Sequence, residues 1–250
     1  MEKVVHIADS QKRHTDIADL EPNREFSFRV NAFNRNGDGE FSETAVIVTG
    51  GIPPKPPEIL GVKLLSPVDE PPLRAMVEWK SPELKPLEAL IDRYHIYYKA
   101  GSSSEFKVKT TEKGDANSTI IEGLRMAEIY EIRVAAENVD GASENATEQL
   151  ETPTGVPDSE PLHVKYEIVD NKMRLSWEPP PADLRHGTIT HYTAILTPMD
   201  SEKRMEKNVT SQFVDFDISP HKSYTFKVSA STMKGPGPLS PILTIIPDPQ

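Results

Sequence analysis

Hydrophobic residues recur at every second position in several short segments of the chain. Three of these segments are opened by an aromatic residue that follows Leu or Ile by six positions. The pairs are Leu20 and Phe26, Leu124 and Tyr130, and Ile218 and Tyr224. Successive side chains of a strand point to opposite faces of a sheet, so a period of two predicts strands with one buried face. In the segment that starts at Tyr224, we expect Lys227 and Ser229 to face outwards.

Two further landmarks repeat with a spacing of 98 residues. Trp79 and Trp177 each end an alternating segment, and Tyr94 and Tyr192 each lie in the segment that follows. Short strands separated by Pro, Gly, Asn and Asp turns, in units of roughly 100 residues, are typical of antiparallel β-sandwiches. We therefore predict an all-β chain built from tandem sandwiches.

Proline-rich segments at 52–57 and 152–157 separate the repeats. Such segments favour extended polyproline geometry and act as semi-rigid spacers, so we expect an elongated array. The predicted domains are unit 1 (residues 1–50), unit 2 (53–152) and unit 3 (157–247). Unit 1 holds only the rear part of a repeat, without the Trp and the first three strands. A sandwich without them exposes its edges, and we predict that residues 1–50 do not form a stable domain alone.

These landmarks resemble the fibronectin type III domain, in which a Trp ends the second strand and Leu-x-Pro-x-x-x-Tyr-x-x-x-Val-x-Ala leads into the sixth. Residues 20–32 fit this motif with Phe26 in place of Tyr. Met126 stands where the family often has Pro, and Ile218 stands for Leu. The resemblance covers nearly the whole chain and implies seven-stranded immunoglobulin-like sandwiches. Their core signature consists of Leu20, Phe26, Trp79, Tyr94, Leu124, Tyr130, Trp177, Tyr192, Ile218 and Tyr224.

Composition narrows the function classes. The 250 residues include 23 prolines, no cysteine, 28 basic and 39 acidic side chains. The absence of cysteine excludes a disulfide scaffold, a thiolate metal site and a cysteine nucleophile. The net charge of −11 disfavours nucleic acid and anionic membranes as partners. No apolar run approaches the ~20 residues of a membrane helix, and the start resembles no signal peptide. We interpret Met1 as an internal methionine of a longer reading frame; the alternative is a cytosolic protein that begins there.

Catalytic motifs such as Gly-x-Ser-x-Gly, His-Glu-x-x-His or a phosphate loop do not occur in the sequence. We therefore expect no enzyme activity, cofactor or metal in this segment. His186 and His191 straddle the predicted start of a strand, which favours exposed turn and strand residues over a metal pair. His95 is expected to lie solvated on an outward face beside Tyr97.

Three Asn-x-Ser/Thr sequons start at Asn117, Asn145 and Asn208. All three fall where loops or strand ends are expected, and a glycan needs an exposed acceptor in a secreted protein. The sequons therefore discriminate between an extracellular and a cytoplasmic location.

Three charged features give weaker indications of a partner. Lys113-Gly114-Asp115 resembles a variant of an integrin-binding tripeptide, but it precedes the fifth strand and is typical turn chemistry. Residues 53–154 hold 12 basic and 18 acidic side chains, which could steer a basic partner or simply form a solvated surface. The compact basic cluster is too small for heparin or nucleic acid; it consists of Lys203, Arg204 and Lys207.

The function is indicated by resemblance. Residues 32–66 resemble a junction between contactin domains, and residues 177–192 with 235–240 resemble LAR-type receptor phosphatases and DCC-type netrin receptors. This implies a spacer and protein-binding segment of an adhesion molecule or receptor, on the extracellular side of the plasma membrane. Its partners would be cell-surface or matrix proteins; its oligomeric state is left open. The alternative is an intracellular structural array of the kind found in giant muscle proteins.

Overall fold

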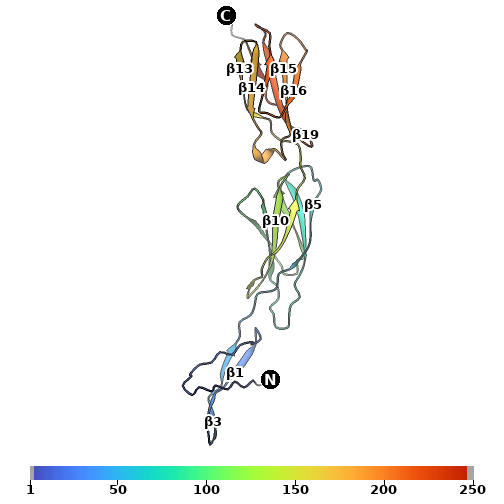
Figure 1. The fold of residues 1–250 in the computed structure, drawn as a ribbon. Helices are drawn as coiled ribbons and strands as arrows, with labels where there is room; N and C mark the ends of the chain where they lie inside the picture. The colour runs from blue at the N-terminus through green and yellow to red at the C-terminus, as the bar shows by residue number, and fades with distance from the viewer. Residues whose placement is uncertain (1–2, 247–250) are drawn as a thin grey trace.

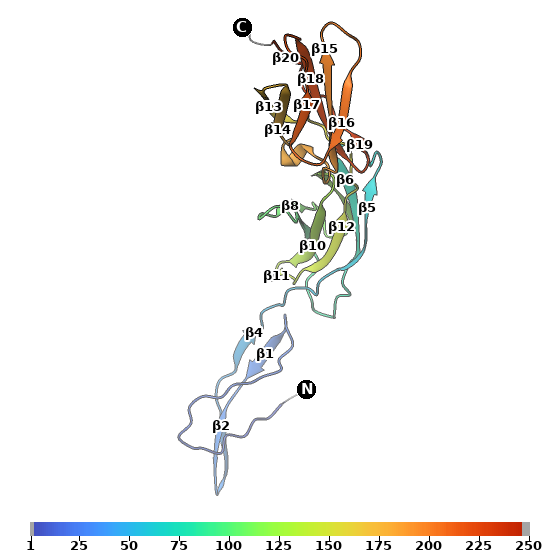
Figure 2. The same ribbon diagram turned by 45° about the horizontal axis from the view of Figure 1, so that its top comes forward.

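The computed structural model describes residues 3–246 as three units that follow one another along an extended chain (Figures 1 and 2). Within these residues, the helical structure is one 3-10 turn, η1 (Ala182–Leu184). No helix in the described part of the chain is long and apolar enough to span a bilayer. The prediction of tandem antiparallel sandwiches is confirmed; Met1 and residue 247, the outer limits of the predicted units, lie outside the described residues.

Unit 2 consists of two antiparallel sheets that enclose one core. The smaller sheet has the order β5-β6-β9, and in the larger sheet β10 pairs with β7, β11 and β12, while β7 also pairs with β8. Their bounds are β5 (Glu58–Leu65), β6 (Leu73–Lys80), β7 (Arg93–Ala100), β8 (Lys107–Thr110), β9 (Ser118–Leu124), β10 (Ile129–Asn138), β11 (Gly141–Ala142) and β12 (Ala146–Glu151). Side chains of β6 alternate between buried and more exposed positions, as a period of two requires.

Unit 3 repeats this arrangement. Its smaller sheet has the order β13-β14-β17, and in its larger sheet β18 pairs with β15, β19 and β20, while β15 also pairs with β16. Their bounds are β13 (Leu162–Val169), β14 (Lys172–Glu178), β15 (His191–Pro198), β16 (Met205–Val209), β17 (Phe213–Asp217), β18 (Tyr224–Thr232), β19 (Gly235–Pro236) and β20 (Leu243–Ile245). The seventh strand of both complete units is thus split into two pieces, β11 with β12 and β19 with β20.

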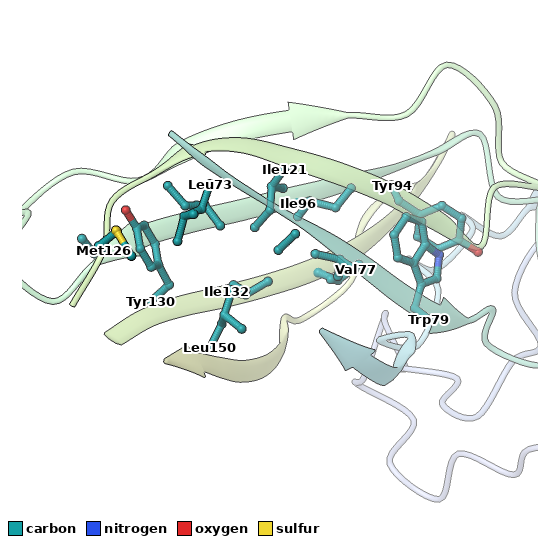
Figure 3. Packing of buried hydrophobic residues seen from close by; sticks show 14 of the residues in the cluster. Leu73, Val77, Trp79, Tyr94, Ile96, Ile121, Met126, Tyr130, Ile132 and Leu150 are labelled. Atoms are coloured by element: carbon teal, nitrogen blue, oxygen red, sulfur yellow. The ribbon is translucent and has the colours of Figure 1, made fainter. Parts of the chain in front are cut away.

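The two cores are built alike around an aromatic pair. Ring centroids of Trp79 and Tyr94 are 5.1 Å apart, and those of Trp177 and Tyr192 are 5.4 Å apart. Figure 3 shows the first pair at one end of the unit 2 core, with Tyr130 at the other end. Aromatic pairs at these separations add to the free energy gained by burying their apolar surface.

The described residues of unit 1 form no such core. Its strands are β1 (Glu25–Phe28), β2 (Asn31–Asn34), β3 (Gly37–Phe41) and β4 (Ala45–Val48), and they form two separate two-stranded sheets, β1-β4 and β2-β3. The prediction of one strand in the alternating segment that opens at Phe26 is therefore wrong, because the segment breaks between β1 and β2. Val30 lies in this break and is 68% exposed, since no described strand covers that face.

One expected outward residue in unit 3 is buried. Ser229 is only 4% exposed, so the expectation that it faces solvent is wrong. It is a short side chain in the central strand β18, which pairs with β15 on one side, while the adjacent Val228 carbonyl accepts a hydrogen bond from the Ser240 amide on the other. Longer neighbours can cover a side chain of this size.

Candidate functional site

The structure places the signature residues of units 2 and 3 together in the two cores. Those buried are Trp79, Tyr94, Leu124, Tyr130, Trp177, Tyr192 and Tyr224. Ile218 is partly buried against the unit 3 core. Leu20 and Phe26 are half-buried in unit 1, where no residue of the described range 3–50 is fully buried. In units 2 and 3 these residues therefore stabilise the two cores, and they do not converge on a reactive centre.

Two tyrosines fasten the chain that leads into the sixth strand. The Tyr130 hydroxyl oxygen accepts a hydrogen bond from the Arg125 amide at 2.8 Å, and the Tyr224 hydroxyl oxygen accepts one from the Ser219 amide at 2.9 Å. Such tyrosine corners are a hallmark of immunoglobulin-like sandwiches. Phe26 has no hydroxyl group, so unit 1 lacks this bond.

The three sequon asparagines are all exposed. Asn117 precedes β9 and Asn145 precedes β12, both in loops, while Asn208 lies near the end of β16. The Asn208 carbonyl oxygen Oδ1 accepts a hydrogen bond from Thr193 Oγ1 at 2.8 Å, which leaves its amide nitrogen directed away from this bond. Exposure of the acceptor is compatible with a glycan at each position.

His95 is not a freely solvated residue, and that expectation is wrong. Its side chain is 19% exposed, and its Nε2 contacts the Glu137 carboxylate across two paired strands. His95 Nδ1 lies 2.9 Å from Thr110 Oγ1. The hydrogen bond with His95, together with the charge of Arg93, holds the pKa of Glu137 below its ordinary value. This contact joins β7, β8 and β10 on the outer face of the larger sheet.

His186 is also not exposed as expected. It is only 7% exposed and lies where the linker between units 2 and 3 meets unit 3. Its Nδ1 is 3.1 Å from the Val156 carbonyl oxygen, and its Nε2 is 3.7 Å from Asp158 Oδ2. Sequence reasoning missed this burial because it depends on how the linker folds against the sandwich.

The remaining candidate features show ordinary structural roles. Lys113-Gly114-Asp115 lies in the turn between β8 and β9, where the Thr111 hydroxyl donates to the Lys113 carbonyl at 3.0 Å. In the basic cluster, Arg204 pairs with Glu206 at 3.3 Å, and Lys207 Nζ donates to the Asp215 carbonyl at 2.7 Å. Across the described residues, no three His, Asp or Glu side chains are arranged to hold a metal ion.

A hollow lies between units 2 and 3. It is a groove of about 700 Å³, and charged residues of both signs line it from both units. Examples are Arg125 and Glu128 from unit 2 and Asp183 and Arg185 from unit 3. The motifs in the sequence gave no indication of this groove, because residues separated by more than 50 positions meet only at the joint.

A model of the fibronectin type III domain matches residues 62–153 and 157–246. The chain belongs to the fibronectin type III family. The two matches cover the two complete sandwiches, and the domain type is non-catalytic. Fibronectin type III units of this chain thus account for its sheets, its repeat and its aromatic cores.

Relatives are similar over almost the whole chain. The Tyrosine-protein phosphatase Lar-like of Caenorhabditis elegans is 48% identical over 252 residues, which cover 99% of this chain and 11% of that protein. Receptor-type tyrosine-protein phosphatase F of Mus musculus is 30% identical over 241 residues, or 95% of this chain and 12% of that protein. Protein sidekick-1 of Gallus gallus is 28% identical over 239 residues, or 92% of this chain and 11% of that protein.

The chain therefore spans about a tenth of the length of these curated relatives. The predicted resemblance to LAR-type receptor phosphatases is confirmed. Among solved structures, the crystal structure of chicken CNTN1 FN1-FN3 domains is 20% identical, covers 92% of this chain and 79% of that chain, and gives a TM-score of 0.35.

Proposed function

We propose that this chain is a non-enzymatic spacer and protein-binding segment of an adhesion receptor, exposed on the extracellular side of the plasma membrane. The observation that carries this proposal is the 48% identity to a LAR-like phosphatase over 99% of the chain. Receptor-type and sidekick relatives support the same class of protein. Partners would be cell-surface or matrix proteins that contact exposed loops and sheet faces.

The repeat supports the proposed domain boundaries. We assign units to residues 53–152 and 157–247, and we assign residues 1–50 to the rear part of a further fibronectin type III unit. In both unit 1 and unit 2, a threonine hydroxyl near the end of the unit donates to the backbone before the sixth strand. Thr49 Oγ1 donates to Glu21 O at 2.6 Å, and Thr152 Oγ1 donates to Arg125 O at 2.8 Å.

Glycosylation tests the proposed compartment. The chain, fused to a secretory leader and produced in animal cells, is expected to carry N-glycan on at least one of Asn117, Asn145 and Asn208. Peptide mapping before and after enzymatic glycan removal measures the occupancy. For each sequon, the Asn→Gln variant should remove only its own glycan, and Asn171→Gln, at an exposed turn outside any sequon, should change nothing.

A secreted, folded chain that carries no glycan at any of the three positions would contradict the extracellular assignment and favour the intracellular structural array. The extracellular assignment would be supported if each sequon variant lost its own glycan while the Asn171→Gln variant kept the glycans of the natural chain. Thr147→Ala abolishes the sequon at Asn145, and Thr210→Ala abolishes the sequon at Asn208, while both asparagines are kept. Each variant should reproduce the result of the corresponding Asn→Gln variant.

A further inference from the structure

The two joints between units follow one plan. A side chain at the end of the sixth strand hydrogen-bonds a linker carbonyl in each case. Asn138 Nδ2 donates to Ile52 O at 3.3 Å, and Thr232 Oγ1 donates to Gly155 O at 2.6 Å. Gly155 therefore occupies the place in the second joint that Ile52 occupies in the first.

Side chains from both units meet at the second joint, beside the groove that Met126 and His186 also line. A Cβ atom on Gly155 would stand 2.6 Å from Met126 Sδ and 3.3 Å from His186 Cβ. Met126 belongs to the buried core of unit 2, and His186 is a buried residue of unit 3. A Cβ atom on this residue would displace the Met126 thioether, which is the flexible end of that side chain, so a large residue at this position has to repack the joint. Met126 stands where the family often has Pro, and its longer side chain extends the unit 2 core into the joint.

Hydrogen bonds also tie Gly155 and the linker residues that follow it to unit 3. The Gly155 amide donates to the His186 carbonyl at 2.8 Å, and the Asp158 amide donates to the Leu184 carbonyl at 2.9 Å. Since a carbonyl oxygen only accepts, His186 Nδ1 carries the proton that it donates to Val156 O at 3.1 Å. The linker is thus bonded in at least three places to the segment that precedes β15.

The first joint is packed differently. The atoms nearest to the position of a Cβ on the linker residue Gly51 belong to the carboxylate of Asp140 in unit 2. Ile52 is 42% exposed, and the hydrogen bonds of Asn23 that link units 1 and 2 directly lie between exposed groups. Asn23 Nδ2 donates to the Leu87 carbonyl at 2.9 Å and lies 3.4 Å from Asp140 Oδ2. Water can replace such exposed bonds at little cost in free energy, whereas it cannot replace buried packing. The linker also contains Gly50, and a Cβ atom on this residue would meet nothing within 4 Å, so packing does not restrict its backbone.

We infer that Met126, Gly155 and His186 form a plug that fixes units 2 and 3 as one rigid rod, while the joint between units 1 and 2 bends. The angle between units 2 and 3 is then set by packing, because the plug belongs at once to the unit 2 core, the linker and unit 3. This inference concerns the shape of the chain and holds whatever the units bind and wherever the protein resides.

Pairs of spin labels test the rigid rod in the full chain. The natural sequence has no cysteine, so two introduced cysteines carry the labels without background. Glu148→Cys with Glu178→Cys places labels on exposed residues on either side of the joint, in β12 and β14. Lys172→Cys with Glu178→Cys places both labels on β14, roughly 20 Å apart at ~3.3 Å per residue, as the reference. Pulsed electron spin resonance then gives each distribution of distances.

The expected result is one narrow peak across the joint, no more than twice as wide as the reference peak. Gly155→Ile introduces the residue of the first joint and should broaden the peak at least twofold. His186→Asn removes the imidazole but keeps a residue suited to its φ of +53°, and it should broaden the peak as well. Ile52→Val, at the equivalent position of the first joint, should leave the peak unchanged.

Circular dichroism and tryptophan emission verify that each variant keeps its two sandwiches. A natural chain with a peak more than twice as wide as the reference would overturn the rigid joint. A narrow peak that persists in both Gly155→Ile and His186→Asn would overturn the plug as its cause.

Discussion

Strand β1 of unit 1 and strand β10 of unit 2 start from the same sequence pattern and end in different environments. Both are preceded by a turn that a threonine hydroxyl ties to the end of the unit, through Thr49 in one case and Thr152 in the other. Yet Tyr130, which opens the run in β10, is buried in a core, whereas Phe26 in β1 is only half-buried. The turn therefore forms from contacts within the rear part of each unit, but burial of the strand requires the opposing sheet.

The same difference governs the length of the strand. β10 continues for ten residues because β7 pairs with it on one side and β11 and β12 pair with it on the other. Among the described residues of unit 1, the equivalent segment pairs first with β4 and then with β3, and it breaks between these partners. Alternation in the sequence shows which residues are suited to a buried face, while neighbouring strands decide whether that face forms.

The largest expected effect comes from the aromatic cores. Trp79→Ala should lower the free energy of unfolding of unit 2 by about 3–5 kcal/mol, because it removes a fully buried indole and leaves a cavity. Scanning calorimetry of the full chain measures this change. Phe26→Ala is the matched variant in unit 1 and should leave the calorimetric transitions nearly unchanged. A comparable loss in both variants would show that unit 1 has a core of its own.

A smaller effect is expected from the tyrosine corner. Tyr130→Phe should cost about 1–3 kcal/mol, because the partly buried Arg125 amide loses its acceptor while the ring remains. Tyr166→Phe is the control, since Tyr166 is an exposed residue on β13. Urea denaturation compares the two variants with the natural chain. Equal stability of both variants would mean that the corner contributes nothing in unit 2.

The smallest expected effect belongs to an exposed ion pair in unit 3. Arg174 donates to both Asp215 carboxylate oxygens, at 2.7 and 2.9 Å, and this hydrogen bonding lowers the pKa of Asp215. A carboxyl group with a lowered pKa in the folded state stabilises the fold above its unfolded-state pKa of about 3.9, and the gain is lost as the pH falls through the folded value. Exposed pairs contribute little, so the effect is small.

Arg174→Gln should therefore melt slightly below the natural chain at pH 7 and together with it near pH 2. Lys165→Gln removes an exposed basic residue of the adjacent strand β13 and serves as the control. Thermal melting followed by circular dichroism measures both variants at both pH values. A difference that persists at pH 2 would assign the effect of Arg174 to its packing on Phe213, whose ring centroid lies 4.8 Å away, rather than to charge.

The sequence predicted the sandwiches because their landmarks are periodic and local. Alternation around Trp79 and the spacing from Leu124 to Tyr130 follow from strand geometry, and both fit the structure. The environment of His95 was not predictable, since its partner Glu137 lies 42 residues away on a paired strand. His186 was missed for a related reason, because its burial depends on a linker that folds back onto it. Met126 was noted as a departure from the motif, but its contact with Gly155 arises only in three dimensions.

Hydrogen exchange followed by mass spectrometry tests most directly whether an opposing sheet makes the difference between units. In the full chain, the amides of β10 and β18 should exchange slowly, because they lie in paired strands over buried cores. Amides of residues 25–34 should exchange close to the rate of an unstructured chain, although their sequence pattern is the same. Protection of residues 25–34 as strong as that of β10 would contradict this account.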